Sequence, residues 1–462
     1  MSVPFWGVVG AYGLRDVMVQ GWEKIVLDSR RFKRIKAEEP QIQADPFCCL
    51  PTYRKRPRTV FLICHSFYPD SAGGTEGFTL RLAQQLIGAG CRVLLFAHAA
   101  RPQRRFEKEL HGILYAYEKI EGISVIRLRH RTPPRGLLKG FPDDSAMTAF
   151  ARAFLEREKP NVVHFTHLAR LYGFFEACRE TSTPYVVTLT DFFGICHYST
   201  RIDRNGALCL NSQQGTRCAK YCHSCQVSDF SQRYLAARQF LYGAELLIAP
   251  SEYVAYTFKR EFPSITVCVI PHGIDMPVCC TLRSNPVRRF GYVGQISEAK
   301  GIILLLKAFQ TMPEDCTLDI YGSGNRVYLA KMRKLIKRDT RVRFWGALSS
   351  KKIQEVYQGL DCVVVPSLVP ETYNFVAREA LQSGCLVIAS DIGALAEAVG
   401  FHANGRLFHC GDSEALLVAM QQAYKTCPVQ AVKMAPTIEE EAAAYLDCYP
   451  VDCGGGGDKC TP

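Results

Sequence analysis

The sequence lacks any apolar run long enough to cross a membrane. The longest such stretch near the start, residues 5–14, falls well short of the roughly 20 apolar residues that a spanning helix needs. It also lacks a preceding basic segment and an obvious cleavage site, which argues against a secretory signal. We therefore expect a cytoplasmic protein.

The sequence also lacks a base-stacking motif that would make its basic stretches a nucleic-acid-binding surface. The net charge is +12, and Lys and Arg cluster in residues 30–36, 54–58 and 101–139. We therefore expect no nucleic-acid partner. Two interpretations of these stretches stay open: a solvated surface, or attraction to the anionic inner face of a membrane, where each basic residue contributes about 1 kcal/mol.

Cysteine, in contrast, is abundant. Most of the 21 cysteines, such as Cys64, Cys362 and Cys385, lie in or beside apolar strands and helices, so we expect them to be reduced core residues. The apolar content of 48% and charged content of 22% are those of a folded protein. A length of 462 residues is too great for one ordinary core and predicts two domains.

The order of strand and helix patterns divides the chain. Residues 1–57 form a basic extension, 58–275 a first α/β domain and 286–436 a second, with a cysteine-rich insertion at 191–230. A helix at 437–450 is expected to pack back on the first domain, and the glycine-rich tail 451–462 to be flexible. The predicted fold class is α/β, with two doubly wound, Rossmann-like sheets facing each other across a ligand cleft.

One segment of the second domain carries the strongest chemical signal. The apolar run 360–367 predicts a buried strand, and residues 375–382 predict a helix that ends before Gly384, where a left-handed cap would fall. A loop between them opens at the carboxyl edge of the sheet and places Glu371 in the cleft. The N-terminus of the helix suits a diphosphate, and Glu379, about two turns along, can bind hydroxyls such as those of a ribose.

With these residues in view, the chain resembles the retaining glycosyltransferases of family 4, glycosyl transferases group 1, which have the GT-B fold. The resemblance spans about residues 58–450 and rests on the joint order of several motifs. These are residues 67–69, 73–76, 162–164, 247–251, 270–275, 291–295, 300–301, 321–324, 344–346 and 366–367, together with Glu371 and Glu379.

The resemblance implies a nucleotide-sugar donor, with a UDP, GDP or ADP moiety, and no catalytic metal. Lys300 would bind the donor diphosphate and support the leaving group, and Glu371 would contact the transferred sugar. Missing Cβ atoms at Gly73 and Gly74 would let backbone amides approach phosphate, although a simple tight turn stays open. The implied donor-binding residues are Gly73, Gly74, Gly294, Gln295, Lys300, Gly322, Gly346, Asn374, Phe375, Val376 and Glu379.

Two donor-side positions depart from the family pattern. Gln295 stands where many relatives carry a second phosphate-binding arginine, and Arg378 or Arg201 is a candidate substitute. Asn374 replaces a glycine. Because Asn is the non-glycine residue that best tolerates positive φ, we expect the tight turn to survive.

The acceptor side departs further. Relatives often have His-x-His-His and His-Asp, where this chain has residues 164–167 with His164 and His167, and Thr190 before Asp191. Either histidine is a candidate for contact with the reacting region, and Asp191 for orienting an acceptor hydroxyl. The resemblance implies front-face attack by the acceptor, with the leaving phosphate helping to take its proton.

The acceptor itself is expected to be a glycan or a lipid-linked precursor of the cell envelope. The alternative function is a catalytically silent scaffold that binds a partner through the cysteine-rich insertion and the basic extension.

The cysteine-rich insertion predicts a metal site. Cys209, Cys218, Cys222 and Cys225 supply four soft ligands at short spacings, with Cys196 as an alternate, which suits tetrahedral zinc. An iron–sulfur cluster and free or disulfide-forming thiols stay open. Because the insertion follows Asp191, we expect it to shape the acceptor site.

Overall fold

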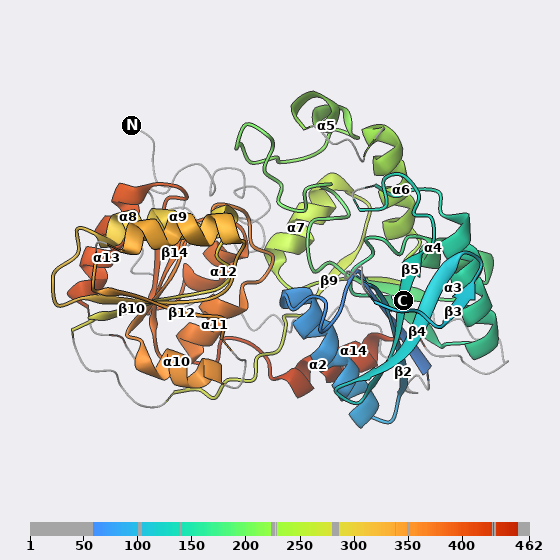
Figure 1. Cartoon of the computed structure of the whole chain (residues 1–462), viewed down its shortest axis with the longest axis horizontal. Coiled ribbons are helices and arrows are strands. Elements are labelled where there is room, and N and C mark those ends of the chain that lie inside the picture. The colour runs from blue at the N-terminus through green and yellow to red at the C-terminus, as the bar shows by residue number, and fades with distance from the viewer. Residues whose placement is uncertain are drawn as a thin grey trace, which may run out of the picture. The chain divides into compact units, whose positions relative to one another are not determined.

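The chain divides into two compact units in the computed structural model (Figure 1). The structure describes residues 59–450 except 100–103, 139, 223–226, 228, 280–285, 338, 349–351, 427, 429 and 430. Of the described residues, one unit, here the N-terminal unit, comprises residues 59–273 and 436–450, and the other, the C-terminal unit, comprises residues 274–435. No helix in the described part of the chain is long and apolar enough to cross a membrane.

The N-terminal unit is built on a sheet of order β3-β4-β5-β2-β1-β6-β7-β8-β9, in which only β3–β4 and β4–β5 pair antiparallel. Its strands are β1 (Thr59–Cys64), β2 (Arg92–His98), β3 (Lys108–Leu110), β4 (Ile113–Ile120), β5 (Ile123–His130), β6 (Val162–Phe165), β7 (Tyr185–Thr188), β8 (Leu246–Ala249) and β9 (Val267–Val269). Its helices are α2 (Gly74–Gly88), α3 (Ser145–Glu158), α4 (Gly173–Glu180), α5 (Thr216–Tyr221), α6 (Phe230–Tyr242), α7 (Glu252–Glu261) and α14 (Ile438–Cys448).

Apolar side chains on both faces of this sheet explain why its inner strands β1 and β2 are buried beyond their first residues. On one face α2 and α14 pack over β1 and β2, as Phe78 of α2 against Tyr445 of α14 shows, with ring centroids 5.7 Å apart. On the other face α3 and α4 cover Phe96 of β2, whose ring lies 4.9 Å from that of Phe174. A parallel sheet covered on both sides leaves its carboxyl edge as the open place for chemistry.

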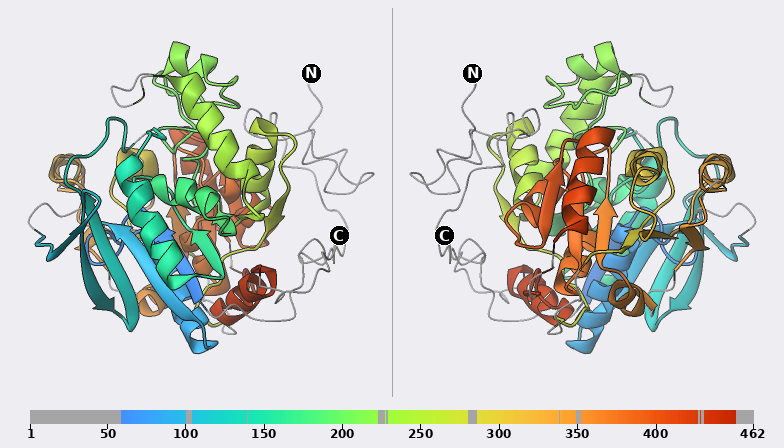
Figure 2. Two further views of the ribbon diagram at one scale, coloured as in Figure 1. Left: turned by 90° about the vertical axis from the view of Figure 1, so that its right-hand side faces the viewer. Right: turned by 90° about the vertical axis from the view of Figure 1, so that its left-hand side faces the viewer.

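The helix α14 returns to the N-terminal unit from the end of the chain and lies beside α2 (Figures 1 and 2). Thr437 and Glu440 form a capping box at its start. Glu441 is buried and accepts hydrogen bonds from the His272 ring at 2.8 Å and the Gly273 amide at 2.8 Å. These hydrogen bonds fix α14 to the segment around His272 and Gly273, which follows β9.

The C-terminal unit has a wholly parallel sheet of order β12-β11-β10-β13-β14-β15. Its strands are β10 (Arg289–Val293), β11 (Thr317–Tyr321), β12 (Val342–Gly346), β13 (Cys362–Val365), β14 (Leu386–Ser390) and β15 (Gly405–Phe408). Its helices are α8 (Ile302–Phe309), α9 (Arg326–Ile336), α10 (Ile353–Gly359), α11 (Phe375–Gln382), α12 (Ala394–Val399) and α13 (Ser413–Tyr424), with a short 3-10 turn, η3 (Glu298–Lys300). Residues of α8, α9 and α13 form one core layer, and residues of α10, α11 and α12 form the other.

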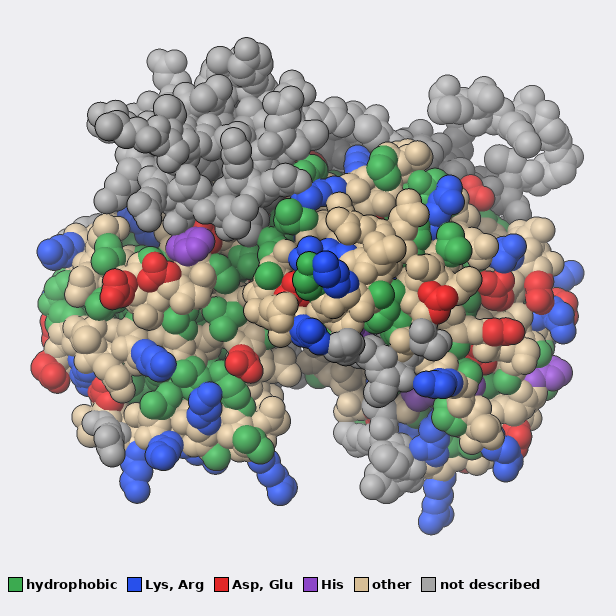
Figure 3. Space-filling model, turned by 90° about the horizontal axis from the view of Figure 1, so that it is seen from above, with side chains coloured by type: hydrophobic (Ala, Val, Ile, Leu, Met, Phe, Trp, Pro, Cys, Tyr) green, Lys and Arg blue, Asp and Glu red, His purple; other side chains and the backbone are tan. Residues whose placement is uncertain are grey.

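Charged side chains of both signs are interspersed on the face shown in Figure 3. The basic stretches 30–36 and 54–58 lie outside the described residues. The expected attraction to an anionic membrane surface therefore stays a prediction from sequence.

Candidate active site

The C-terminal sheet has a single point where its strand order reverses. Counted along this unit, the order β12-β11-β10-β13-β14-β15 is 3-2-1-4-5-6, so the reversal falls between β10 and β13. Parallel sheets of this kind bind ligands at the carboxyl ends of the strands on either side of such a reversal. The loop after β10 carries Gln295 and Lys300, and the loop after β13 carries Glu371 and Asn374.

Lys300 and Glu371 form an ion pair at this point. The Lys300 Nζ lies 2.6 Å from the Glu371 Oε1, and the Ser367 hydroxyl donates to the same oxygen at 2.5 Å. The Glu371 side chain is 11% exposed and that of Lys300 is 32% exposed, so both retain contact with solvent. The structure therefore brings together the two residues that the sequence predicts for the phosphate and for the sugar.

The two loops touch through their backbones as well. The Leu368 amide donates to the Ala299 carbonyl at 2.8 Å. Gly301, directly after Lys300, has φ +68°, and a Cβ there would lie 1.8 Å from the Pro366 carbonyl oxygen. Glycine is thus required for this close approach, and it fixes Lys300 beside the loop of Glu371.

Asn374 caps the helix that follows. Its φ is +61°, and its side-chain oxygen accepts a hydrogen bond from the Ala377 amide at 2.8 Å. The expectation that asparagine preserves the turn is confirmed. Phe375 and Val376 are the first two residues of α11, and Glu379 lies in its second turn, where its Oε2 accepts from the buried Tyr357 hydroxyl at 2.9 Å.

The predicted donor-side glycines also converge. The Gly294 and Gly322 loops run side by side, and a Cβ on Gly322 would lie 1.8 Å from the Gly294 carbonyl oxygen. The Gly322 amide donates to the Gly346 carbonyl at 2.7 Å. These glycines follow β10 and β11 and end β12, so three neighbouring loops meet at one edge of the sheet, beside the exposed residue Gln295.

Both candidate substitutes for the missing arginine are buried. Arg378 is buried, with its guanidinium 4.2 Å from the Tyr373 ring centroid and 3.5 Å from Glu397. Arg201 is also buried and donates to the Tyr253 hydroxyl at 2.9 Å. Both guanidinium groups lie against protein groups, and within the described residues the Arg378 Nε has no hydrogen-bond partner, so a substitute for the arginine stays a prediction.

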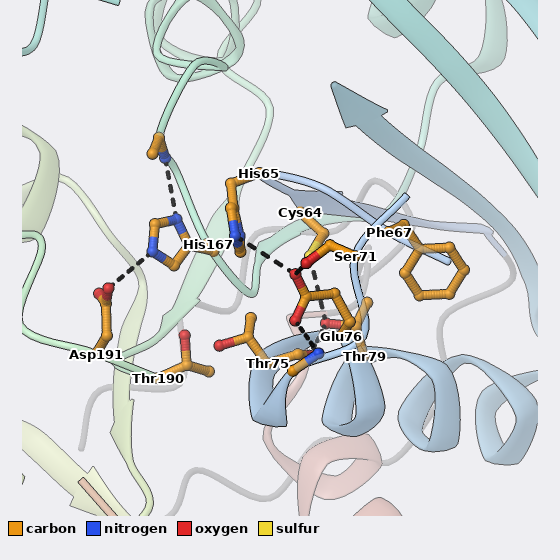
Figure 4. A network of polar contacts seen from close by, with 12 residues as sticks. Cys64, His65, Phe67, Ser71, Thr75, Glu76, Thr79, His167, Thr190 and Asp191 are labelled. Atoms are coloured by element: carbon orange, nitrogen blue, oxygen red, sulfur yellow. Dashed lines mark hydrogen bonds and ion pairs between the residues drawn. The ribbon is translucent and has the colours of Figure 1, made fainter. Parts of the chain in front are cut away.

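The N-terminal sheet reverses its order between β1 and β6, and polar residues follow both strands. His65 comes directly after β1 and His167 shortly after β6, with ring centroids 4.1 Å apart. The His167 Nδ1 accepts from the Ala169 amide at 3.2 Å, which leaves Nε2 to donate to the Asp191 carboxylate at 3.0 Å (Figure 4). Burial would raise the pKa of Asp191, but the His167 imidazole and the Phe193 amide outweigh it and lower the pKa.

Glu76 of α2 contacts His65 and two residues of the loop that precedes the helix. Its Oε2 accepts from the Gly73 amide at 2.9 Å, and its Oε1 accepts from the Ser71 hydroxyl at 2.6 Å and lies 3.5 Å from the His65 Nε2 (Figure 4). The Gly73 amide is therefore occupied within the protein. Gly74 is exposed at the first position of α2.

His65 was not identified as a site residue from the sequence, and Glu76 only as part of a motif. Burial, followed by the charge of neighbouring His167, lowers the pKa of His65, so this imidazole is neutral at pH 7. The feature that could have identified His65 is its position directly after the first buried strand, at the reversal point of the sheet.

His164 lies away from this edge. It is fully buried, its Nδ1 is 2.7 Å from the Tyr449 hydroxyl, and its Nε2 is 2.7 Å from the Thr188 hydroxyl. Burial lowers the pKa of His164 to about 3. Of the two candidate histidines, only His167 contacts Asp191.

The cysteine-rich insertion is only partly described. Burial, followed by nearby thiols of the insertion, raises the pKa of Cys218 to about 12 and that of Cys222 to about 11, and it also raises the pKa of Cys209. Within the described ranges no three His, Cys, Asp or Glu side chains are placed to hold a metal ion. Cys225 lies outside them, and zinc stays a prediction.

Known families match both units of the chain. The model for glycosyl transferases group 1 matches residues 287–426, and the model for glycosyltransferase family 4 matches residues 72–276. An uncharacterised glycosyltransferase of Methanocaldococcus jannaschii is 27% identical over 313 residues, which cover 63% of this chain and 72% of that protein. A D-inositol 3-phosphate glycosyltransferase of Xylanimonas cellulosilytica is 23% identical over 439 residues, 85% of this chain and 96% of the relative.

Solved structures agree with the fold. Sucrose-phosphate synthase from Thermosynechococcus elongatus superposes with a TM-score of 0.58 at 18% identity, covering 85% of this chain and 95% of that one. HepE of Anabaena, solved with UDP, gives a TM-score of 0.56 at 18% identity, covering 85% and 96%. With two α/β units that each match a family model, the chain belongs to the GT-B glycosyltransferases of group 1 and family 4 and is a glycosyltransferase.

Proposed function

We propose that the enzyme moves a sugar from a nucleotide-sugar donor to a sugar-containing or lipid-linked acceptor, with retention of configuration at the anomeric carbon. The observation that carries the donor half is the Lys300–Glu371 ion pair at the reversal point of the C-terminal sheet. The complexes of HepE with UDP and with UDP-glucose support a nucleotide-sugar donor. A donor screen identifies the base and the sugar.

The donor roles follow from the positions of the groups. Lys300 stabilises the negative charge that develops on the leaving diphosphate. Glu371, which Lys300 and Ser367 orient, contacts the transferred sugar. Glu379 binds ribose hydroxyls, since it lies in the second turn of the helix whose N-terminus suits the diphosphate.

The reaction breaks the bond between the anomeric carbon and the phosphate oxygen and forms one from that carbon to an acceptor hydroxyl oxygen on the same face. The departing phosphate takes the hydroxyl proton. In the N-terminal unit we assign the positioning of the acceptor to His167 and Asp191, because they lie at the carboxyl edge while His164 is buried. Preorganised contacts of this kind supply most of the rate in such a mechanism.

Relatives point to envelope glycans as one acceptor class. A lipopolysaccharide 1,2-N-acetylglucosaminetransferase of Salmonella typhimurium is 29% identical over 185 residues, 34% of this chain and 48% of that protein. The basic stretches near residue 30 and residue 54 would draw the enzyme to an anionic membrane that holds such acceptors. The catalytically silent scaffold is not favoured, since the ion pair at the donor site is intact.

The test is a screen of UDP-, GDP- and ADP-sugars for binding and slow donor hydrolysis. We expect one donor class to bind, and Lys300→Ala and Glu371→Gln to lower the rate of donor cleavage by about 100- to 1,000-fold. Lys307→Ala on α8 and Glu355→Gln on α10 are exposed matched controls and should leave the rate unchanged. Well-folded protein that binds no nucleotide sugar contradicts the proposal, and an inverted product anomer in NMR contradicts retention.

A further inference from the structure

His65 is the more accessible of the two stacked histidines at the carboxyl edge of the N-terminal sheet (Figure 4). Its side chain is 27% exposed and that of His167 is 9% exposed, with ring centroids 4.1 Å apart. His65 directly follows β1, one of the two strands at the reversal point of the sheet, where such sheets bind ligands. A ligand that reaches the stacked rings therefore touches the ring of His65 more readily than that of His167.

The two rings differ in which nitrogen atoms are already paired. Both nitrogens of His167 are used, because Nδ1 accepts from the Ala169 amide and Nε2 donates to Asp191. The Nδ1 of His65 is buried and has no hydrogen-bond partner within the described residues. Because a buried polar atom without a partner is costly, this nitrogen is the one in the stacked pair that a ligand can satisfy.

Glu76 sets the chemical character of that nitrogen. Its Oε1 lies 3.5 Å from the His65 Nε2, and the Ser71 hydroxyl and the Gly73 amide hold the carboxylate in place at 2.6 Å and 2.9 Å. A carboxylate fixed beside Nε2 favours the tautomer that carries its proton there. Burial, followed by the charge of His167, lowers the pKa of His65 to about 2, so the ring is neutral and its Nδ1 keeps a lone pair.

The segment that joins His65 to Glu76 is also anchored by β5. Arg127 of that strand is fully buried and donates to the Phe67 carbonyl at 3.1 Å. The Glu76 side chain is itself only 4% exposed. The fold therefore holds the imidazole and the carboxylate in place before any ligand arrives, which is what a positioned substrate contact requires.

We propose that His65 contacts the acceptor sugar, with its Nδ1 accepting a hydrogen bond from a hydroxyl next to the one that attacks the donor. The partner of an unprotonated ring nitrogen must be a hydrogen-bond donor, which excludes an ionised phosphate and fits a sugar hydroxyl. This inference rests on the proposed function, because it adds a residue that touches the substrate to His167 and Asp191, the pair that positions the acceptor.

Imidazole nitrogen NMR on the full chain with isotopically labelled histidine measures this contact without catalysis. The ligand probes are the p-nitrophenyl glycosides of glucose, galactose, mannose and N-acetylglucosamine. The signals of His65 are assigned by their loss in His65→Asn, and we expect an unprotonated Nδ1 whose resonance moves when one of these glycosides is added. A proton on Nδ1 in the unaltered chain, or an Nδ1 resonance that no glycoside moves, overturns the proposal.

Variants at His65 separate the roles of its two nitrogens. Asparagine offers an oxygen near the Nδ1 position, glutamine offers an amide near the Nε2 position, and phenylalanine keeps only the ring. We expect His65→Gln and His65→Phe to raise the Kd of the bound glycoside, measured by calorimetry, about tenfold, and His65→Asn to raise it less than about threefold. His111→Gln, at an exposed loop residue, is the matched control and should change nothing.

Two results with these variants would overturn the contact. Unchanged glycoside binding in folded His65→Phe would show that only the packing of the ring matters. Weaker binding in His65→Asn than in His65→Gln would show that Nδ1 is not the nitrogen that meets the ligand. If a variant does not fold, the NMR titration of the unaltered chain still decides.

Nucleotide-sugar binding, measured in parallel, distinguishes a failure of this inference from a failure of the proposed function. A glycoside that moves the His65 Nδ1 resonance in a chain that binds no nucleotide sugar refutes the proposed donor function alone. A chain that binds and cleaves a nucleotide sugar, but whose Nδ1 resonance no glycoside moves, refutes the His65 contact alone.

Discussion

At the residue scale, Asn374 adopts a backbone conformation that few side chains tolerate, and it does so where the loop after β13 becomes α11. Its φ of +61° and its hydrogen bond to the Ala377 amide are both needed there. We expect Asn374→Ala to lower the free energy of unfolding by about 2 kcal/mol, since it loses a cap and keeps the strain. Asn374→Gly should cost only a few tenths of a kcal/mol because glycine caps well and relieves the strain.

Urea denaturation of the two variants measures this difference. The control is Asn325→Ala, which removes the cap of α9 at a residue with φ −68° and should cost only about 1 kcal/mol. Equal losses for Asn374→Ala and Asn374→Gly would contradict the prediction, because they would show that positive φ carries no penalty at this position.

The residues that could be identified from the sequence belong to local motifs, whereas the roles of the others depend on tertiary contacts. Lys300, Glu371 and Asn374 belong to local motifs, and the structure places them together. The environment of Arg378 depends on Tyr373 and on Glu397, two partners that no local pattern specifies. His164 and His167 are three residues apart, and for the same reason only their tertiary contacts show that His167, not His164, contacts Asp191.

At the scale of elements, the strand and helix around the glutamate pair are confirmed. β13 is buried along its length, α11 spans Phe375–Gln382, and Gly384 has φ +77° after the helix end. The sequence did not predict β3 and β4. Residues of β4 are mostly half-exposed, so the alternation that marks a strand with one covered face is weak, and basic residues around it suggested a surface cluster.

The helix α14 depends on buried hydroxyl contacts that periodicity could not reveal. The Tyr449 hydroxyl lies 2.7 Å from the His164 Nδ1, and the Tyr445 hydroxyl lies 3.0 Å from the Thr188 hydroxyl. We expect Tyr449→Phe to lower the free energy of unfolding by about 1–3 kcal/mol, because it leaves a buried ring nitrogen without its partner. Chemical denaturation measures this loss, with Tyr242→Phe at a 42% exposed position as the matched control.

The cysteine-rich insertion is an element whose role depends on one ligand beyond the described residues. Elemental analysis of protein purified without chelator should find about one zinc per chain if Cys209, Cys218, Cys222 and Cys225 form a tetrahedral site. Cys225→Ser should lose the metal, and Cys279→Ser should retain it. Iron with sulfide would instead indicate a cluster, and metal-free protein of full stability would refute both.

At the scale of the whole molecule, the two units differ in how burial shifts the pKa values of their titratable side chains. Burial lowers the pKa of His65, His98 and His164, all in the N-terminal unit, and the last two reach about 3. In the C-terminal unit burial lowers the pKa of His402 but raises that of Asp391, two effects of opposite sign on stability. Sequence alone could not predict this contrast, because each shift follows from tertiary burial.

The consequence is that acid should destabilise the N-terminal unit first. Between an unfolded histidine pKa of about 6.5 and the lowered folded values, the unfolded state binds more protons, so stability falls as pH falls. Each histidine contributes up to about 1.4 kcal/mol per pH unit in that window. Pulsed hydrogen exchange, after incubation at pH 7 and at pH 5, measures this effect. The increase in exchange from pH 7 to pH 5 should be larger in peptides of β1, β2 and β6 than in peptides of β10 and β13. Equal acceleration of exchange in both units would contradict this prediction. In a folded His164→Asn variant, which lacks this titrating ring, the difference in acceleration between the two units should be smaller.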